Sequence, residues 1–185
     1  MVKKSKDKKW YTILAPKIFG SVEIGQTSTA DPDLLIGRKI DVSLMTLIND
    51  FKKYYMKFKF KIVSVDNSNA HTEFDGSQCL SDYVSRMVLK YSRRVDTVQN
   101  LVTKDGIKVR VKGLGIIRSR VKSSIKSNIR IVIREIVKRE VEGATLEGLI
   151  RGIISDSIKN KVLREARKIY PVRNFEIRKT EVLAE

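Results

Sequence analysis

The ten residues from Met56 to Val65 constrain the fold of this chain more than any others, because apolar and basic side chains alternate along them. Successive side chains of a β-strand point to opposite faces, so a period of two predicts a half-buried strand. Its open face then carries a row of lysines, Lys57, Lys59 and Lys61. Turn-forming residues follow at 66–69, and residues 70–74 are expected to return as its hairpin partner.

A second pair of strands is predicted around the dipeptide Asp105-Gly106. It lies between two alternating runs, 95–103 and 107–112, and Asp-Gly in that setting is the strongest short hairpin signal in the chain. One side of the second strand is basic, with Lys108, Arg110 and Lys112. Shorter strands, rich in aromatic or β-branched residues, are predicted at 10–14, 21–26 and 39–44.

The spacing of apolar residues changes to three and four in two parts of the chain, which is the period of an amphipathic helix. Between Leu80 and Tyr91 it predicts one short helix. From about 123 to 170 it predicts three more, at 123–142, at 145–154 and from 156 or 157 to the stop at Pro171. Residues 173–183 then predict a final strand that pairs with an edge of the earlier sheet, because an isolated strand is unstable.

These elements predict an α+β fold with a barrel-like, mostly antiparallel sheet, a C-terminal group of helices and a final strand. We expect one domain over 10–185, strand-rich to about 120, with two small lobes as the alternative. Residues 1–9 hold five lysines and predict a disordered basic arm whose Lys3 and Lys4 contact phosphate. The alternative is a solubilising tail.

A net charge of +17 on 185 residues points to a polyanionic partner. Residues 104–139 contain twelve basic side chains and only two acidic ones. Such a field attracts phosphate, with an affinity that falls as salt rises. Nucleic acid is therefore the first hypothesis for the partner, and an anionic membrane surface is the second.

Three basic surfaces are candidates for RNA binding. The first is the lysine row Lys57, Lys59 and Lys61. The second runs from hairpin to helix and comprises Lys108, Arg110, Lys112, Arg118, Arg120 and Lys122. The third is a helix face with Lys126, Arg130 and Arg134. We interpret residues 113–124 as the strongest candidate, a basic loop whose small residues allow close backbone approach, with a solvated loop as the alternative. Trp10-Tyr11 and Tyr54-Tyr55 are candidates to stack on bases, although at least one member of each pair is expected in the core.

The sequence predicts no catalytic residue, no metal site and no cofactor. His71 and Cys79 are the only residues of their types, so they form neither a metal cluster nor a disulfide. Gly113-Leu114-Gly115 is too short for a dinucleotide fingerprint. No apolar run approaches the roughly 20 residues of a membrane span, and the charged N-terminus is unlike a secretory signal. We therefore expect a cytoplasmic protein.

Several motifs, in order along essentially the whole chain, resemble one family of ribosomal proteins. They are Trp10-Tyr11 with Ala15-Pro16 and Phe19, Gly37–Leu44 with Leu47–Asp50, Thr103–Gly106 with Arg110, Ile129-Arg130 with Arg134–Ile136 and Arg139–Val141, Ile154–Ile158, Lys168–Arg173 and Ile177–Lys179. The family is the archaeal and eukaryotic small-subunit family S3Ae, also called eS1. The chain lacks the long C-terminal extension of eukaryotic members and so looks archaeal.

The resemblance implies a structural constituent of the small ribosomal subunit that functions in translation. It implies a site at the platform, near the messenger RNA exit, in contact with small-subunit (16S-type) rRNA and neighbouring platform proteins. It also implies a barrel-like sheet with helices around it. The alternatives are a free-standing RNA-binding protein or RNA chaperone, and an enzyme acting on RNA, for which the sequence offers no carboxylate cluster or second histidine.

Overall fold

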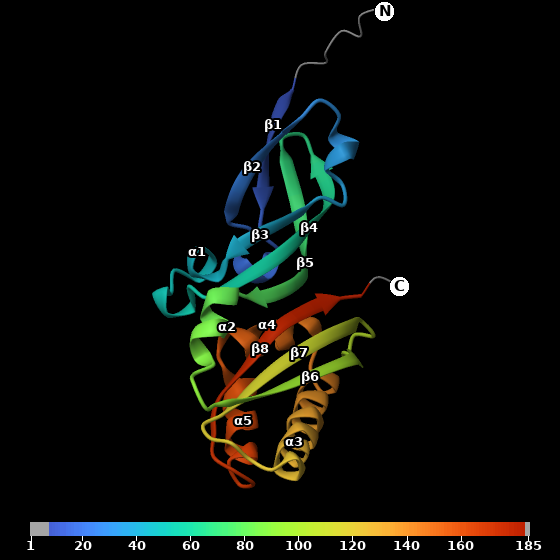
Figure 1. Cartoon of the computed structure of the whole chain (residues 1–185). Helices are drawn as coiled ribbons and strands as arrows, with labels where there is room; N and C mark the ends of the chain where they lie inside the picture. Colours follow the sequence, from blue (N-terminus) through green and yellow to red (C-terminus); the bar gives the residue numbers. More distant parts are fainter. Residues whose placement is uncertain (1–7, 184–185) are drawn as a thin grey trace, which may run out of the picture. The chain divides into compact units, whose positions relative to one another are not determined.

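The computed structural model describes residues 8–183, which divide into two compact units between Gly76 and Ser77 (Figure 1). Lys3 and Lys4, like the rest of the predicted arm up to residue 7, lie outside the described residues. The single RNA-binding domain predicted over 10–185 stays a prediction.

The first unit is built from strands. They are β1 (Lys9–Leu14), β2 (Glu23–Thr29), β3 (Lys39–Ser43), β4 (Met56–Asp66) and the first part of β5 (Asn69–Cys79), with a short helix α1 (Leu44–Ile48) after β3. Strand β1 pairs with β2 in antiparallel fashion and with β5 in parallel fashion, and β4 pairs with β3 and β5. The turn between β4 and β5 places Asn67 in the left-handed region, at φ 48°.

The predicted strand 56–65 is confirmed as β4, and its alternation has the expected cause. Met56, Phe58, Phe60 and Ile62 are each at most 2% exposed, whereas the lysines between them lie on the other face. Phe58 and Phe60 pack edge-to-face with Phe74 of β5, with ring centroids 5.4 and 6.5 Å apart. These aromatic contacts form the core of the first unit and hold β4 in a single register.

The second unit combines a sheet with helices. Its elements are α2 (Ser81–Met87), β6 (Arg93–Val102), β7 (Lys108–Ile117), α3 (Ser123–Glu142), α4 (Leu146–Ile154), α5 (Ser157–Ala166) and β8 (Val172–Val182), together with the end of β5. Strands β6 and β7 form the predicted hairpin, and Gly106 at φ 81° supplies the turn. Strand β8 pairs antiparallel with β7 and lies between β7 and β5 in the strand order, so the predicted final strand finds its partner.

Helix α3 packs against β6, and α5 packs against both α3 and β8 (Figure 1). The buried stripe of α3 includes Ile129, Ile133 and Val137, which is the face that the three- and four-residue spacing predicts. Helix α4 begins at the predicted position because the Thr145 side chain accepts a hydrogen bond from the Gly148 backbone N–H at 3.1 Å. The α+β class, the mostly antiparallel sheet, the C-terminal helices and the final strand are confirmed, and the sheet is open.

Three local predictions are wrong. The helix expected from 156 or 157 up to Pro171 ends at Ala166, and Ile169 of its predicted stripe is exposed. The helix expected over 80–91 ends at Met87, and Tyr91 lies beyond it with φ 69°. The residues from Gly113 to Ile117 belong to β7 and are buried, so the loop expected at 113–124 is restricted to the segment before α3. The physical reason is tertiary packing, because a Cβ on Gly113 would meet Thr97 and Phe175, and a Cβ on Gly115 would meet Ile133 of α3.

Candidate nucleic-acid interface

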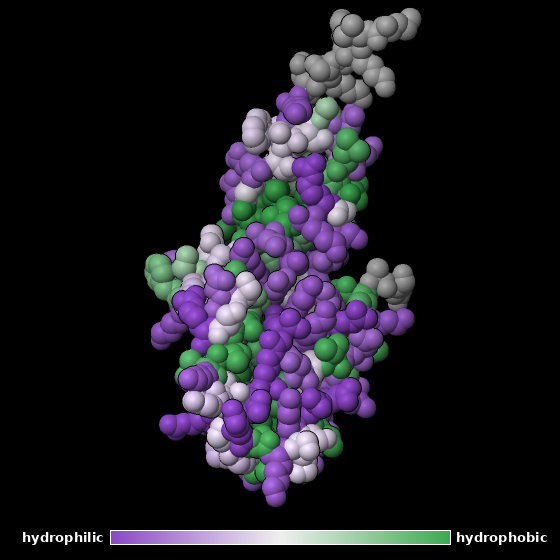
Figure 2. Space-filling model, in the orientation of Figure 1, coloured by the Kyte–Doolittle hydropathy of each residue, from purple (hydrophilic) through white to green (hydrophobic). Residues whose placement is uncertain are grey.

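One face of the second unit's sheet carries many exposed charged side chains, although Leu114 and Ile116 on the same face are buried. Residues directly opposite in an antiparallel ladder share a face, and the register pairs Val98 with Lys112, Asn100 with Arg110, and Lys112 with Lys179. We call this surface the sheet face. Its members are Arg94, Asp96, Val98, Asn100, Val102, Lys108, Arg110, Lys112, Lys179 and Glu181. In the orientation of Figure 1, the surface visible over this unit is mostly hydrophilic (Figure 2).

Hydrogen bonds within and between strands hold most of the basic side chains of the sheet face in place. The Glu181 carboxylate accepts hydrogen bonds from the ammonium groups of Lys179, at 2.5 Å, and of Lys112, at 2.9 Å. These hydrogen bonds, Lys179 first, lower the pKa of the Glu181 carboxyl to about 2. Arg110 donates from Nε to the amide oxygen of Asn100 at 2.8 Å, so its charge has a neutral partner. The face therefore presents ordered cations with a net positive charge.

The segment between β7 and α3 carries Arg118, Arg120 and Lys122, all exposed. The Arg120 guanidinium lies 5.7 Å from the ring centroid of Tyr91, and the Lys90 ammonium lies 5.2 Å from the same centroid. Tyr91 is 62% exposed. An accessible aromatic ring beside two cations suits stacking on an unpaired base next to a phosphate. The spacing of apolar residues assigns Tyr91 to a helix stripe, so it is not among the predicted stacking residues, although the basic residues Lys90, Arg93 and Arg94 beside it were a signal.

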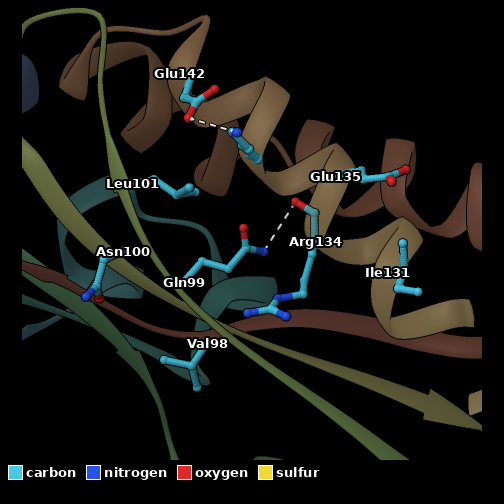
Figure 3. Close-up of a pocket in the computed structure, with 9 residues that line it drawn as sticks. Val98, Gln99, Asn100, Leu101, Ile131, Arg134, Glu135 and Glu142 are labelled. Carbon is cyan, nitrogen blue, oxygen red and sulfur yellow. Dashed lines mark hydrogen bonds and ion pairs between the residues drawn. The ribbon is translucent and has the colours of Figure 1, made fainter. Parts of the chain in front are cut away.

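The third predicted surface lies along α3, beside the outer edge of β6. Arg130 donates from Nε to the backbone oxygen of Asp96 at 3.3 Å, and Lys126 is partly buried, so both have structural as well as electrostatic roles. Arg134 is exposed and lines a groove of about 540 Å³ between α3 and β6 (Figure 3). Gln99 donates from Nε2 to the Arg134 backbone oxygen at 3.3 Å across this groove (Figure 3).

The predicted lysine row belongs to the first unit. Lys57 and Lys61 are exposed on β4, and Lys59 lies 4.0 Å from Asp41 of the paired strand β3. Lys39 lies opposite Lys61 in the same ladder and pairs with Asp75 at 2.8 Å. The row therefore forms as predicted, with part of its charge balanced by neighbouring carboxylates.

The two aromatic pairs divide as expected. Tyr11 is 4% exposed and Tyr55 is 5% exposed, so both belong to the core. Trp10 is 67% exposed and Tyr54 is 47% exposed, so each pair leaves one ring at the surface. These two rings are the stacking candidates of the first unit.

The residues singled out for other chemistry have ordinary structural roles. His71 lies 3.2 Å from Asp66, and the buried Cys79 thiol donates to the Ile177 backbone oxygen at 3.3 Å. Across residues 8–183, no group of three His, Cys, Asp or Glu side chains is placed to hold a metal ion. Within the same part of the chain, no helix is long and apolar enough to cross a membrane.

Comparison with known proteins identifies the family. A model of the Ribosomal S3Ae family matches residues 1–185. The small ribosomal subunit protein eS1 of Methanothermobacter thermautotrophicus is 42% identical over 180 residues, which cover 97% of this chain and 92% of that protein. Its counterpart from Methanopyrus kandleri is 40% identical, covering 98% and 88%, and that from Sulfurisphaera tokodaii is 34% identical, covering 97% and 93%. The family is not one of enzymes, in agreement with the sequence analysis. The chain belongs to the Ribosomal S3Ae family.

Proposed function

We propose that the protein is a structural constituent of the small ribosomal subunit, in the cytoplasm, and binds 16S-type rRNA there. The observation that carries this proposal is the second unit's cluster of cations, which extends from the sheet face through Arg118, Arg120 and Lys122. These side chains neutralise backbone phosphates and thereby allow RNA helices to pack closely. Phosphate contacts position a protein without reading sequence, so we expect recognition of folded RNA by its shape.

The finer location is part of the same proposal. On the family resemblance, the protein lies at the platform near the messenger exit, beside neighbouring platform proteins and exiting messenger RNA. The lysine row of the first unit and the arm with Lys3 and Lys4 are further phosphate contacts in this proposal. A density map of the assembled subunit tests the location directly, and cationic surfaces that face only solvent there would refute it.

Substitution of Arg118, Arg120 and Lys122 by alanine tests the interface. We expect weaker binding to small-subunit rRNA, and a shallower dependence of log affinity on log salt by about one for each lost phosphate contact. The matched control replaces Lys161, Arg164 and Lys168 by alanine and so removes the same amount of positive charge. These three side chains lie beside the carboxylates of Glu140 or Glu165. Equal affinity and salt dependence for the loop variant and the wild type would remove the loop from the interface.

Sedimentation of a cell lysate separates this function from the alternative of a free-standing RNA-binding protein. A ribosomal protein migrates with the small subunit at moderate salt, whereas a free-standing protein or RNA chaperone stays in lighter fractions. If the protein binds RNA but is absent from the small-subunit fractions, the alternative is favoured.

A further inference from the structure

A pocket of about 260 Å³ opens in the second unit where α2 meets the strands β6 and β8. Three cationic side chains line it, Arg94, Arg178 and Lys179, together with the hydroxyl-bearing Ser81 and Ser85 and the amide of Gln78. None of the described residues that line it is acidic. Its volume is below the roughly 300–1,000 Å³ of pockets that enclose whole organic ligands, so a small anionic group is the ligand of suitable size.

Arg178 is the residue in this pocket that lacks an internal partner. Its Nε is buried without a hydrogen bond, and it makes no ion pair with any residue of the described chain. A buried donor that stays without a hydrogen bond destabilises the folded state, and more so when it belongs to a charged group. An anion that entered the pocket would satisfy this donor.

A β-bulge accounts for the position of Arg178. In the ladder between β7 and β8, Lys112 pairs with Lys179, whereas the next residue, Gly113, pairs with Ile177. Arg178 is therefore the extra residue of the bulge and has no partner in the ladder. Bulges redirect side chains and are frequent beside functional sites, and here the bulge directs a guanidinium into the pocket.

The other two cations are held in place by carboxylates that do not line the pocket. Arg94 donates from Nε and Nη2 to Asp96 at 2.7–3.0 Å, and Lys179 pairs with Glu181 at 2.5 Å. Their side chains are thus oriented before any ligand arrives, while the charge of Arg178 stays uncompensated. Ser81 makes one long hydrogen bond, 3.4 Å, to Asp82, so its hydroxyl is weakly engaged.

We propose that this pocket binds a single phosphate group, with the Arg178 guanidinium as its principal donor. Arg94 and Lys179 belong to the sheet face as well as to the pocket, so the pocket opens onto the surface proposed to bind RNA. The phosphate is then a backbone phosphodiester of small-subunit rRNA, an assignment that rests on the proposed function. Arginine suits this role because its planar fork donates two hydrogen bonds to one phosphate.

Inorganic phosphate probes the pocket without RNA. In the full chain we expect phosphate to shift the side-chain Nε–H resonance of Arg178 and to raise the melting temperature above that in chloride of equal ionic strength. Arg178→Gln, which lacks this resonance, is expected to lose the rise in melting temperature. The matched control is Arg173→Gln, which removes an exposed charge from a second bulge of the same strand and leaves both effects intact. No shift of the Arg178 resonance with phosphate, or an equal rise in melting temperature in Arg178→Gln, would overturn the proposal.

Small-subunit rRNA tests the source of the phosphate. We expect Arg178→Gln to weaken binding about tenfold and to reduce the salt slope by about one. Arg178→Lys, which keeps the charge but not the fork, retains the slope and loses affinity. If free phosphate shifts the Arg178 resonance but rRNA does not, the pocket serves free phosphate and the rRNA assignment is wrong. If the wild type does not bind rRNA, the proposed function fails, while the phosphate titration still decides the pocket.

Discussion

Gly113 lies directly against Thr97 in the β6–β7 hairpin, so closely that a Cβ on residue 113 would be 2.7 Å from Thr97 Oγ1. The same Cβ would lie 3.0 Å from the Phe175 ring. Real Cβ atoms do not approach other atoms this closely, so a larger residue forces its neighbours to move. The glycine is buried and is a packing requirement of the second unit.

Gly113→Ala is therefore expected to lower the free energy of unfolding by about 1–3 kcal/mol, the usual effect of overpacking a dense core. Chemical denaturation measures the change. Gly25→Ala in β2 is the matched control, because a Cβ there meets no atom within 4 Å and the backbone does not have the left-handed conformation. Equal stability losses at the two positions would show that crowding is not the cause.

The paired lysines around Glu181 predict a loss of stability in acid. The pKa of Glu181 in the folded protein is about 2, below its ordinary value of 4.5. A lowered pKa stabilises the folded state above pH 4.5, and this contribution is lost as the pH falls from about 4.5 toward 2. Denaturation between pH 7 and pH 2 measures it, and we expect Glu181→Gln to lose stability at pH 7 and to show a shallower decline in acid. A decline of the same steepness in both proteins would contradict the assignment.

A buried ion pair links α5 to β8. Glu176 is 2% exposed, and its Oε1 accepts hydrogen bonds from Lys159 Nζ at 2.5 Å and from the Tyr83 hydroxyl at 3.1 Å. Lys159→Met leaves the carboxylate without its cation, so we expect a loss of about 3–5 kcal/mol in unfolding free energy. The double variant Lys159→Met with Glu176→Gln removes the isolated charge and should be more stable than Lys159→Met alone. If the double variant were less stable than Lys159→Met, the two side chains would stabilise the protein through packing and not through their charges.

Local patterns predicted the parts of the fold that depend on neighbours in sequence. The alternation in β4 and the Asp105-Gly106 turn each depend on a few consecutive residues, and both formed as predicted. The segment after Lys112 was predicted as a loop, because glycines occur both in loops that contact RNA and in tightly packed strands, and the sequence alone does not distinguish the two. Gly115 faces Ile133, 3.1 Å from a Cβ built on it, and only the folded position of α3 reveals this.

The same limit applies to the candidate site. The basic character of Lys108, Arg110 and Lys112 is visible in the sequence, and period two correctly placed them on one face. Arg178 was not predicted as a site residue, because its direction depends on a bulge, and a bulge is a property of register between two strands. Residues positioned by a bulge in the register or by a distant helix are those that local sequence patterns do not reveal.

Tyr91 gives the final prediction, a test of stacking on RNA. Its ring is 62% exposed and lies beside the cations of Arg120 and Lys90, an arrangement that offers a base a stacking surface and its phosphate a counter-charge. We expect Tyr91→Ala to weaken binding to small-subunit rRNA by about 1–3 kcal/mol, the usual contribution of one base–aromatic stack. Tyr91→Phe keeps the ring and should bind like the wild type, since stacking does not use the hydroxyl. Because no charge is removed, the salt slope should stay unchanged in both variants, which distinguishes stacking from the phosphate contacts of the neighbouring arginines. Equal weakening by alanine and phenylalanine would instead assign the effect to the hydroxyl group.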